Sequence, residues 1–168
     1  MANWSMLKAI NTSMLKLKQI YQPSVFWLTA FGLGFLRPAP GTWGSLGAVV
    51  FWWFFLAELT LFAQLGIIVA YFLFSWWLCN RLINRLGVQD EPQIVADEVA
   101  GMWLALIFAP QIWWVALLAF ALFRFFDIAK PGVVGWLDTN VHSGLGVMLD
   151  DLVAGLLSAG IVWLVLQV

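Results

Sequence analysis

Two short acidic motifs carry the clearest chemistry in this sequence. "ADEVAG" contains Asp97 and Glu98, "LDDLVAG" contains Asp150 and Asp151, and in each an Ala-Gly pair follows about one helical turn later. Small residues let two helices approach closely, so we expect the two acid pairs to lie side by side. Four carboxylates in a small space repel one another unless a cation joins them, and hard oxygen ligands suit Mg²⁺. The matched pairs therefore favour a Mg²⁺ site, while either pair alone would also fit helix capping.

A third motif, "FRFFDIAKPG", carries a charge at every third position: Arg124, Asp127 and Lys130. This spacing places the three side chains on one stripe of a helix, next to Pro131. The two cations could bind a phosphate and the carboxylate a metal. An ion-pair ladder on a solvated face is the alternative, and the stripe alone is compatible with both.

The glycine-rich stretch "PGTWGS" at residues 40–45 precedes the first long apolar run. A turn of this composition can present backbone N–H groups and the hydroxyls of Thr42 and Ser45 to an anion, with Arg37 adding positive charge. The stretch lacks the GxxxxGK[ST] pattern of a Walker loop. The alternative is a plain helix start in which Thr42 or Ser45 caps the N-terminus after Pro40.

Two further polar residues are candidates for catalysis. His142, in "NVHSGLG", could protonate a leaving group, ligate a metal or contact a phosphate. Cys79 begins "CNRLINR", which has the C-x5-R spacing of cysteine phosphatases but no glycine to form their phosphate-binding loop. Because this stretch continues a helix, we expect Cys79 to be inert at a membrane edge where arginines extend toward water.

The composition places these motifs in a membrane protein. Of 168 residues, 63% are hydrophobic and 10% are charged, whereas a soluble domain is about a quarter charged. A mean hydropathy of +0.92 leaves too little polar surface for a water-soluble globule. The net charge of −1 and the lack of a Lys/Arg run argue against nucleic acid as a partner. We therefore expect an all-α, polytopic membrane helical bundle.

Apolar runs predict about five transmembrane helices. They lie at 44–58, at 61–86, on either side of a break at 109–111 within the block 99–123, and at 148–167. Residues 24–36, only 13 residues with two glycines, are expected to form an interfacial or re-entrant segment. Residues 1–23 then form an N-terminal cytoplasmic or interfacial segment, and residues 24–168 form a single membrane-embedded domain.

The distribution of charge predicts the orientation in the membrane. The eight Lys and Arg residues fall within residues 8–37, 81–85 and 124–130. By the positive-inside rule these regions and the loops 87–97 and 128–147 face the cytoplasm, whereas the two tight turns and the C-terminus face the opposite side. Eight of the nine acids, all but Glu58, also fall on the cytoplasmic side. The predicted chemistry is therefore on one face of the membrane.

In order and spacing, "RPAPGTWGS", "DEVAG", "FRFFDIAKPG" and "HSGLGVMLDDLVAG" resemble the motifs of the bacterial phosphatidylglycerophosphatase A family, over about residues 32–160. One departure is "KPGVVGW", where the family commonly has a second proline. The resemblance implies a Mg²⁺-dependent, multi-pass enzyme of the bacterial inner membrane with its active site facing the cytoplasm. Its reaction would be hydrolysis of the terminal phosphate monoester of phosphatidylglycerophosphate, which gives phosphatidylglycerol and phosphate.

For such a hydrolysis we expect the residues above to have distinct roles. Five acids would hold one or two Mg²⁺ and so activate a water, with an aspartyl-phosphate route left open: Asp97, Glu98, Asp127, Asp150 and Asp151. Cations and hydroxyls would contact the phosphoryl oxygens, with Lys130 also counted as catalytic: Arg37, Thr42, Ser45, Arg124, Lys130 and His142.

Two other functions are alternatives to the phosphatase. A phospholipid headgroup transferase of the CDP-alcohol type would need a DGxxAR-x8-G-x3-D-x3-D motif, which the sequence lacks. A small non-enzymatic membrane carrier would bind its ion with acids near the middle of a span, whereas here the acids gather at predicted helix ends. Release of phosphate is the observation that separates these functions.

Overall fold

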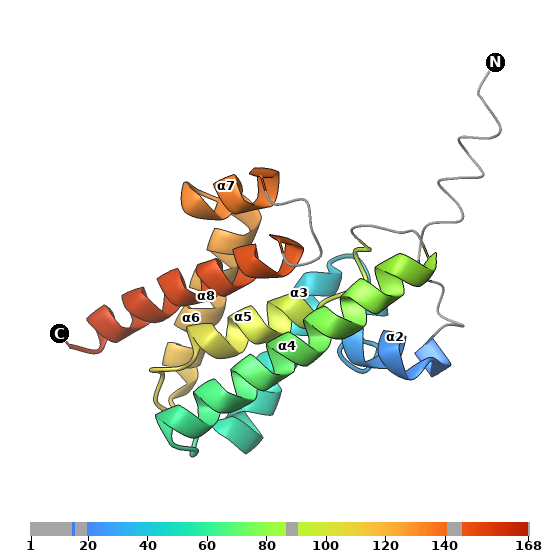
Figure 1. The fold of residues 1–168 in the computed structure, drawn as a ribbon. Coiled ribbons are helices and arrows are strands. Elements are labelled where there is room, and N and C mark those ends of the chain that lie inside the picture. The colour runs from blue at the N-terminus through green and yellow to red at the C-terminus, as the bar shows by residue number, and fades with distance from the viewer. Residues whose placement is uncertain (1–14, 16–19, 87–90, 141–145, 168) are drawn as a thin grey trace.

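The computed structural model describes residue 15 and residues 20–86, 91–140 and 146–167 (Figure 1). Every regular element within these ranges is helical, which confirms the all-α prediction. In chain order they are α2 Pro23–Leu28, η2 Leu33–Phe35, α3 Pro40–Phe51, the π-helical η3 Trp52–Leu56, α4 Leu61–Leu86, α5 Ala96–Ala105, α6 Trp113–Ala129, α7 Val133–Asn140 and α8 Gly146–Val165. Most of the predicted N-terminal segment 1–23 lies outside the described residues.

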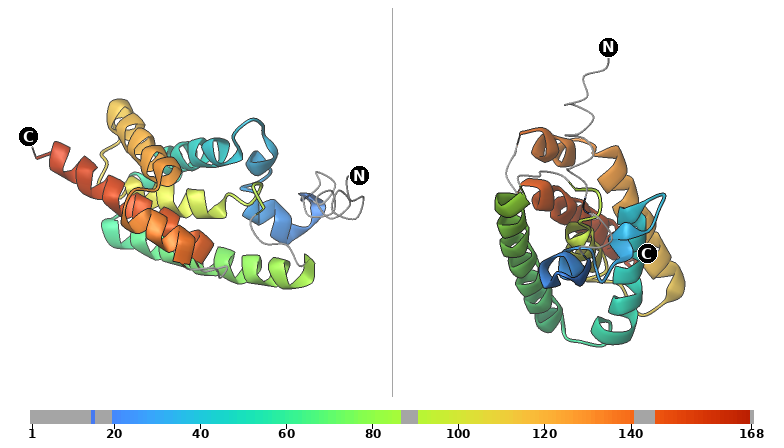
Figure 2. Two further views of the ribbon diagram at one scale, coloured as in Figure 1. Left: turned by 90° about the horizontal axis from the view of Figure 1, so that it is seen from above. Right: turned by 90° about the vertical axis from the view of Figure 1, so that its right-hand side faces the viewer.

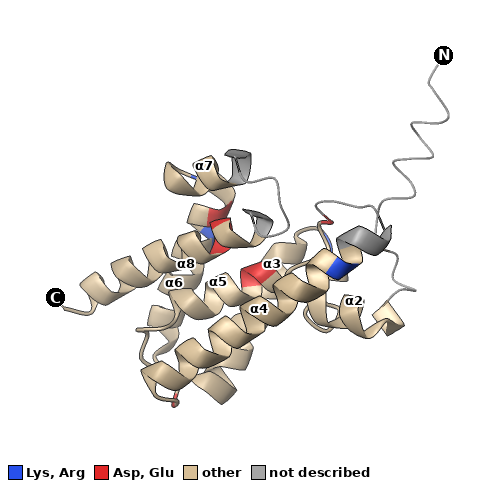
Figure 3. Cartoon of the chain, in the orientation of Figure 1, with Lys and Arg blue, Asp and Glu red and all other residues tan. Residues whose placement is uncertain are grey.

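Helices α3, α4, α5, α6 and α8 traverse the bundle in alternating directions (Figure 1). Contacts at one end join the turns that link them, since Gln111 Nε2 donates to the carbonyl of Trp53 at 2.7 Å and Trp52 Nε1 donates to Gln64 Oε1 at 3.4 Å. The acidic residues of α5 and α8 lie toward the other end (Figure 3). These alternating directions agree with the order of the apolar runs predicted from the sequence.

The short helix α5 lies at the centre of the bundle. It packs against α8, α3, α4 and α6, and these helices surround it in the right-hand view of Figure 2. Nine of its ten residues are buried, all but Glu98. At a rise of about 1.5 Å per residue, ten residues extend about 15 Å, half of a hydrocarbon core of about 30 Å. Because α5 is short and nearly all of its residues are buried, its apolar side chains face other helices.

Two helices are long and apolar enough to cross a membrane: Leu61–Leu82 of α4 and Met148–Val165 of α8. Helices α3, α5 and α6 are shorter, with 12, 10 and 17 residues. By length and composition the described part of the chain thus contains two candidate spans, and the five predicted spans are not confirmed. Large apolar side chains are nevertheless exposed on several helices, for example Phe62 at 84% and Trp113 at 71%, as expected of a surface that faces lipid.

Two glycines allow α5 and α8 to cross at close range. A Cβ atom on Gly101 would lie 2.6 Å from the carbonyl oxygen of Asp151, and one on Gly155 would run into the carbonyl oxygen of Gly101. Backbone therefore meets backbone at this crossing, where no side chain fits. The prediction that small residues bring the two acidic motifs side by side is confirmed.

Two elements differ from the sequence prediction. Helix α3 begins at Pro40, so "PGTWGS" forms its first turns and does not precede a helix that starts at 44. Residues 133–140, predicted as loop, form α7. Residues 24–36 form α2 and η2, and the positive φ angles of Ala30, Phe31 and Gly32 reverse the chain between them. Residues 24–36 therefore do not form one helix across the bundle, which agrees with the prediction that this segment is not a span.

Candidate active site

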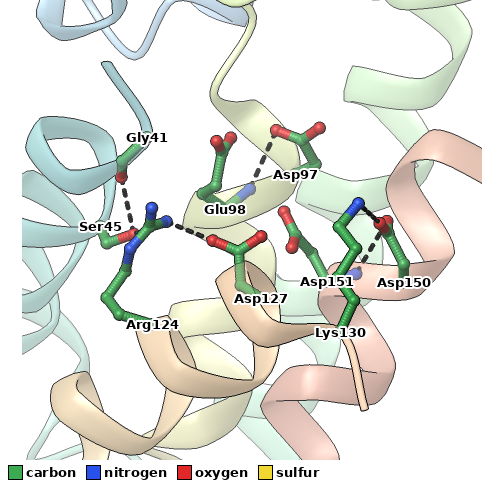
Figure 4. A network of polar contacts seen from close by, with 9 residues as sticks. All are labelled: Gly41, Ser45, Asp97, Glu98, Arg124, Asp127, Lys130, Asp150 and Asp151. Carbon is green, nitrogen blue, oxygen red and sulfur yellow. Dashed lines mark hydrogen bonds and ion pairs between the residues drawn. The ribbon is translucent and has the colours of Figure 1, made fainter. Parts of the chain in front are cut away.

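Three carboxylates from two helices converge at the acidic end of the bundle. Asp97 and Glu98 come from the first turn of α5 and Asp151 from α8, and one oxygen of each lies within 4.8 Å of the others. Figure 4 shows the three side chains around one gap. Asp97 and Asp151 are only 8% and 4% exposed, so this three-carboxylate cluster is part of the protein interior.

Local hydrogen bonds orient the first acid of each motif. Asp97 Oδ1 accepts the N–H of Glu98 at 3.0 Å, and Asp150 Oδ1 accepts the N–H of Asp151 at 3.0 Å. The N-cap of α5 is Val95, which makes no side-chain cap bond. Asp97 therefore satisfies one free N–H of the first turn from inside the helix, and its second oxygen stays available to the cluster.

Glu98 shows that the cluster suits a cation. Its Oε2 is buried and has no hydrogen-bond partner among the described residues, although buried polar atoms are nearly always paired. Burial and the adjacent Asp97 carboxylate raise the pKa of Glu98 well above its usual range, and burial raises the pKa of Asp97. A divalent cation would supply the missing partner and offset the repulsion, and carboxylate oxygens are suitable ligands for Mg²⁺, which completes its coordination with water.

A chain of polar contacts connects α6 with α3 beside the cluster. Arg124 Nη1 forms an ion pair with Asp127 Oδ2 at 2.5 Å and donates to Ser45 Oγ at 3.4 Å. Ser45 Oγ in turn donates to the carbonyl of Gly41 at 2.8 Å. The Asp127 carboxylate lies beside that of Asp151 (Figure 4). Asp127 is therefore at the edge of the cluster, where Arg124 partly balances its charge.

The second cation pairs with the fourth acid of the two motifs. Lys130 is the C-cap of α6 and has left-handed backbone angles, φ 44° and ψ 51°. Its Nζ lies 2.9 Å from Asp150 Oδ2. Asp150 is thus directed to Lys130 and is not one of the three converging carboxylates. The sequence motif groups Asp150 with Asp151, and the structure separates their contacts.

The residues predicted to bind phosphate are placed differently from one another. Arg124 and Lys130 flank the cluster, and Arg124 Nε is buried without a hydrogen-bond partner in the described ranges. Ser45 is fully buried, and Thr42 is half-buried in the first turns of α3. Arg37 is exposed just before α3 and is outside the network of Figure 4. His142 lies outside the described residues.

One residue of the site was not predicted from the sequence. A Cβ atom on Gly41 would run into Glu98 Oε1 and lie 3.2 Å from Arg124 Nη1. Gly41 therefore leaves the space that the Glu98 carboxylate occupies. The sequence pointed to Gly41 only as part of "PGTWGS", where glycine was expected to expose backbone N–H groups to an anion. In the structure its role is to have no Cβ, so that the Glu98 carboxylate fits.

Comparisons with known proteins place the chain in one protein family. The model of the family described as phosphatidylglycerophosphatase A matches residues 26–166. A phosphatidylglycerophosphatase A of Escherichia coli (strain K12) is 42% identical over 141 residues, or 80% of this chain and 78% of the relative. One of Haemophilus influenzae is 36% identical over 150 residues, or 89% and 92% of the two chains.

A third relative carries a different name. A protein of Bacteroides thetaiotaomicron, provisionally named a phosphatidylinositol-3-phosphatase, is 39% identical over 137 residues, or 77% of this chain and 85% of the relative. No solved structure matches the chain significantly. The names of the similar proteins thus share an activity on phosphate monoesters of lipids and differ in the lipid headgroup.

Proposed function

The chain belongs to the phosphatidylglycerophosphatase A family, and from this premise we propose that it removes the terminal phosphate of phosphatidylglycerophosphate at the cluster between α5 and α8. It is a phosphoric monoester hydrolase, and its product is phosphatidylglycerol. The observation that carries the location of the site is the convergence of Asp97, Glu98 and Asp151, with Glu98 Oε2 buried and unpaired among the described residues.

We propose Mg²⁺ as the cofactor, held by the three-carboxylate cluster with Asp127 beside it. When bound, Mg²⁺ supplies a water of lowered pKa and neutralises charge on the phosphoryl oxygens. The donor set supports this assignment, since carboxylate oxygens are hard ligands for a hard cation and one of them, Glu98 Oε2, is buried without a partner among the described residues. One or two ions would fit the acids predicted from the sequence.

The two flanking cations would bind the phosphoryl group. An ammonium has three N–H donors, so Lys130 can contact a phosphoryl oxygen while it remains paired with Asp150. The Arg124 guanidinium has an unpaired Nε, and Asp127 and Ser45 hold its Nη1. Both groups are thus oriented before substrate arrives, which is the condition for electrostatic stabilisation of the charge on the transferring phosphoryl group.

We further propose that the protein is a multi-pass protein of the bacterial inner membrane with the cluster at the cytoplasmic interface. The two candidate spans in α4 and α8, the exposed apolar side chains and the distribution of Lys and Arg support this placement. Helix α5 would be enclosed by the other helices. The lipid would stay in the bilayer, because only its headgroup has to reach the carboxylates.

A second substrate is suggested by the relative named for phosphatidylinositol 3-phosphate. Its phosphate is also a monoester on a lipid headgroup, and the cluster contacts the phosphoryl group that both lipids share. The headgroup beyond the phosphate would then decide between them.

Release of phosphate by the purified protein tests these functions together. The assay would use detergent micelles, a Mg²⁺ titration and three lipids: phosphatidylglycerophosphate, phosphatidylinositol 3-phosphate and phosphatidic acid. We expect the highest kcat/KM with phosphatidylglycerophosphate, and no activity in EDTA. Release from the inositol lipid alone would reassign the substrate. A protein that releases no phosphate from any of the three would point to the transferase or the carrier.

A further inference from the structure

An apolar cavity of about 220 Å³ lies between α2, the turn before η2, α3, α4 and α5. Its wall contains five aromatic side chains, with alanines, valine, leucine and glycine between them. The aromatic residues are Trp27, Phe31, Phe51, Tyr71 and Trp103. The chemistry derived above uses none of these residues, and their composition favours an apolar ligand.

Hydrogen bonds fix the two indoles of the wall in place. Trp27 Nε1 donates to Ser75 Oγ at 2.9 Å, and Trp103 Nε1 donates to the Ala48 carbonyl at 3.0 Å. Both N–H groups are thereby satisfied within the protein, and the rings present carbon to the cavity. The Tyr71 and Trp103 rings also pack at 4.8 Å between centroids. The cavity is therefore preformed, which lowers the cost of ordering it around a ligand.

The cavity runs along α5, the helix that also carries two acids of the three-carboxylate cluster. Val99, which lines it, directly follows Glu98 on α5, and Trp103 lies one turn further along the same helix. The hydroxyl of Tyr71 shares a hydrogen bond with Ser75 and lies within electrostatic range of Asp97 and Glu98. A ligand with a phosphate at the carboxylates would therefore extend its apolar part along α5 into this cavity.

The cavity opens toward the apolar exterior. Phe31 and Phe51, at its rim, are 60% and 38% exposed. The α4 wall, with Tyr71, belongs to the candidate span Leu61–Leu82. A hydrocarbon chain could enter from the side without leaving an apolar environment, whereas a polar ligand would have to cross one.

We propose that this cavity binds one acyl chain of the phospholipid substrate, by the segment next to the glycerol backbone. The proposal rests on the proposed function, because it places the substrate phosphate at the carboxylates. The volume supports one chain segment, since it is below the roughly 300–1,000 Å³ of sites that enclose a drug-sized ligand. The second chain and the distal methylenes remain in the bilayer. The cavity thus positions the lipid by its hydrocarbon and contributes to KM.

A filled cavity tests the proposal by kinetics. Leu33 lines the cavity, and Leu36, close by and 42% exposed, is not among its lining residues. We expect Leu33→Trp to raise KM for long-chain phosphatidylglycerophosphate by about tenfold with kcat unchanged, and Leu36→Trp to leave both constants unchanged. Neither variant should alter hydrolysis of the deacylated headgroup, which has no chain to bind. An unchanged KM in folded Leu33→Trp would overturn the proposal.

A second pair of variants avoids large side chains in the core. Phe51→Ala removes part of the rim, and Phe54→Ala removes an aromatic ring that is 73% exposed outside the cavity. Alanine favours helix at both positions. We expect a raised KM for the long-chain lipid in Phe51→Ala only. Equal KM values in the two variants would contradict the acyl-chain site.

Photo-crosslinking locates the chain directly. Phosphatidylglycerophosphate with a diazirine near the start of one acyl chain should form adducts with Trp27, Phe31 or Trp103, and Leu33→Trp should remove them. The same chain on phosphatidylcholine should label exterior residues such as Phe62 instead. Adducts at the cavity that do not depend on the headgroup would indicate bulk lipid and overturn the proposal. If the wild type releases no phosphate from either the lipid or its deacylated headgroup, the proposed function itself fails.

Discussion

The two acidic motifs are near copies in sequence but differ in what their side chains contact. In both, the first acid accepts the N–H of the next residue at 3.0 Å. On α5 both acids, Asp97 and Glu98, join the three-carboxylate cluster. On α8 only Asp151 does, because Asp150 forms an ion pair with Lys130. The copies thus share their backbone geometry and differ in their chemistry.

The difference comes from the elements packed against each motif. Helix α8 packs against α7 and α6, and the end of α6 presents Lys130 to Asp150. The start of α5 faces α3, where Gly41 leaves room for Glu98. The helices packed against each motif therefore determine which carboxylates remain available to a cation. The repeated sequence motif alone does not determine this.

The largest expected effect is the loss of a carboxylate from the three-carboxylate cluster. Glu98→Gln and Asp151→Asn keep the shape of the side chain and remove a negative ligand, so kcat should fall by several orders of magnitude while the protein stays folded. Phosphate release from phosphatidylglycerophosphate, with circular dichroism as the check of folding, measures this. Near-normal turnover in either variant would remove that residue from the site.

A smaller loss is expected for the acid that pairs with Lys130. Asp150→Asn should lower kcat/KM by about 10–100-fold, the usual range for a residue that orients a ligand or a binding group. Lys130→Met should act similarly, and the double variant should lose less than the sum of the two. If Asp150→Asn is as inactive as Asp151→Asn, the two motifs are alike in function and the comparison fails.

The free energy of unfolding of glycine variants tests the close crossing of α5 and α8, which both motifs share. Gly101→Ala and Gly155→Ala place a methyl group against a carbonyl oxygen of the facing helix, so each should lower the free energy of unfolding by about 1–3 kcal/mol. Gly160→Ala on α8 is the matched control, because its Cβ would meet no atom within 4 Å. Thermal unfolding in detergent should show the order. Equal stability of all three variants would argue against a close crossing.

The helices could largely be predicted from the sequence, because long apolar runs mark helices whatever surrounds them. The prediction of 61–86 agrees with α4. The same signal predicted a span that begins at residue 99, and this is not confirmed, because hydropathy responds equally to burial in lipid and to burial in protein and the ten residues of α5 are mostly buried in protein. Helix α7 was missed because its eight residues give a weak signal in a segment rich in glycine.

The sequence was sufficient to predict most residues of the candidate site, but not which charged side chains form ion pairs with one another. Charge type and spacing singled out the acids and cations, and glycine spacing predicted the close crossing of α5 and α8. The pairing of Asp150 with Lys130 depends on how α6 ends, which spacing does not encode. The aromatic cavity was missed because its wall comes from separate parts of the chain, and aromatic residues are frequent throughout it.

The smallest expected effect is a pH dependence of stability without metal. The pKa of Glu98 is raised in the folded protein above the usual 4.5, so the folded state binds more protons than the unfolded state between these two pKa values. In EDTA the free energy of unfolding should therefore fall as pH rises from about 4.5 through the raised pKa of Glu98. Saturating Mg²⁺ should flatten this dependence. Thermal unfolding from pH 4.5 to 8 tests it, and a flat profile in EDTA would contradict the burial of the Glu98 carboxylate.

Binding of Mn²⁺ would show whether the three-carboxylate cluster holds a cation, because this ion takes the same oxygen ligands as Mg²⁺ and is detected by electron paramagnetic resonance. We expect the purified wild type to bind Mn²⁺, Mg²⁺ to displace it, and Asp151→Asn to lose most of the affinity. Asp150→Asn should retain binding, with at most about a 10–100-fold weaker Kd. Wild-type affinity in Asp151→Asn, or an equal loss in both variants, would contradict a cation site made by Asp97, Glu98 and Asp151.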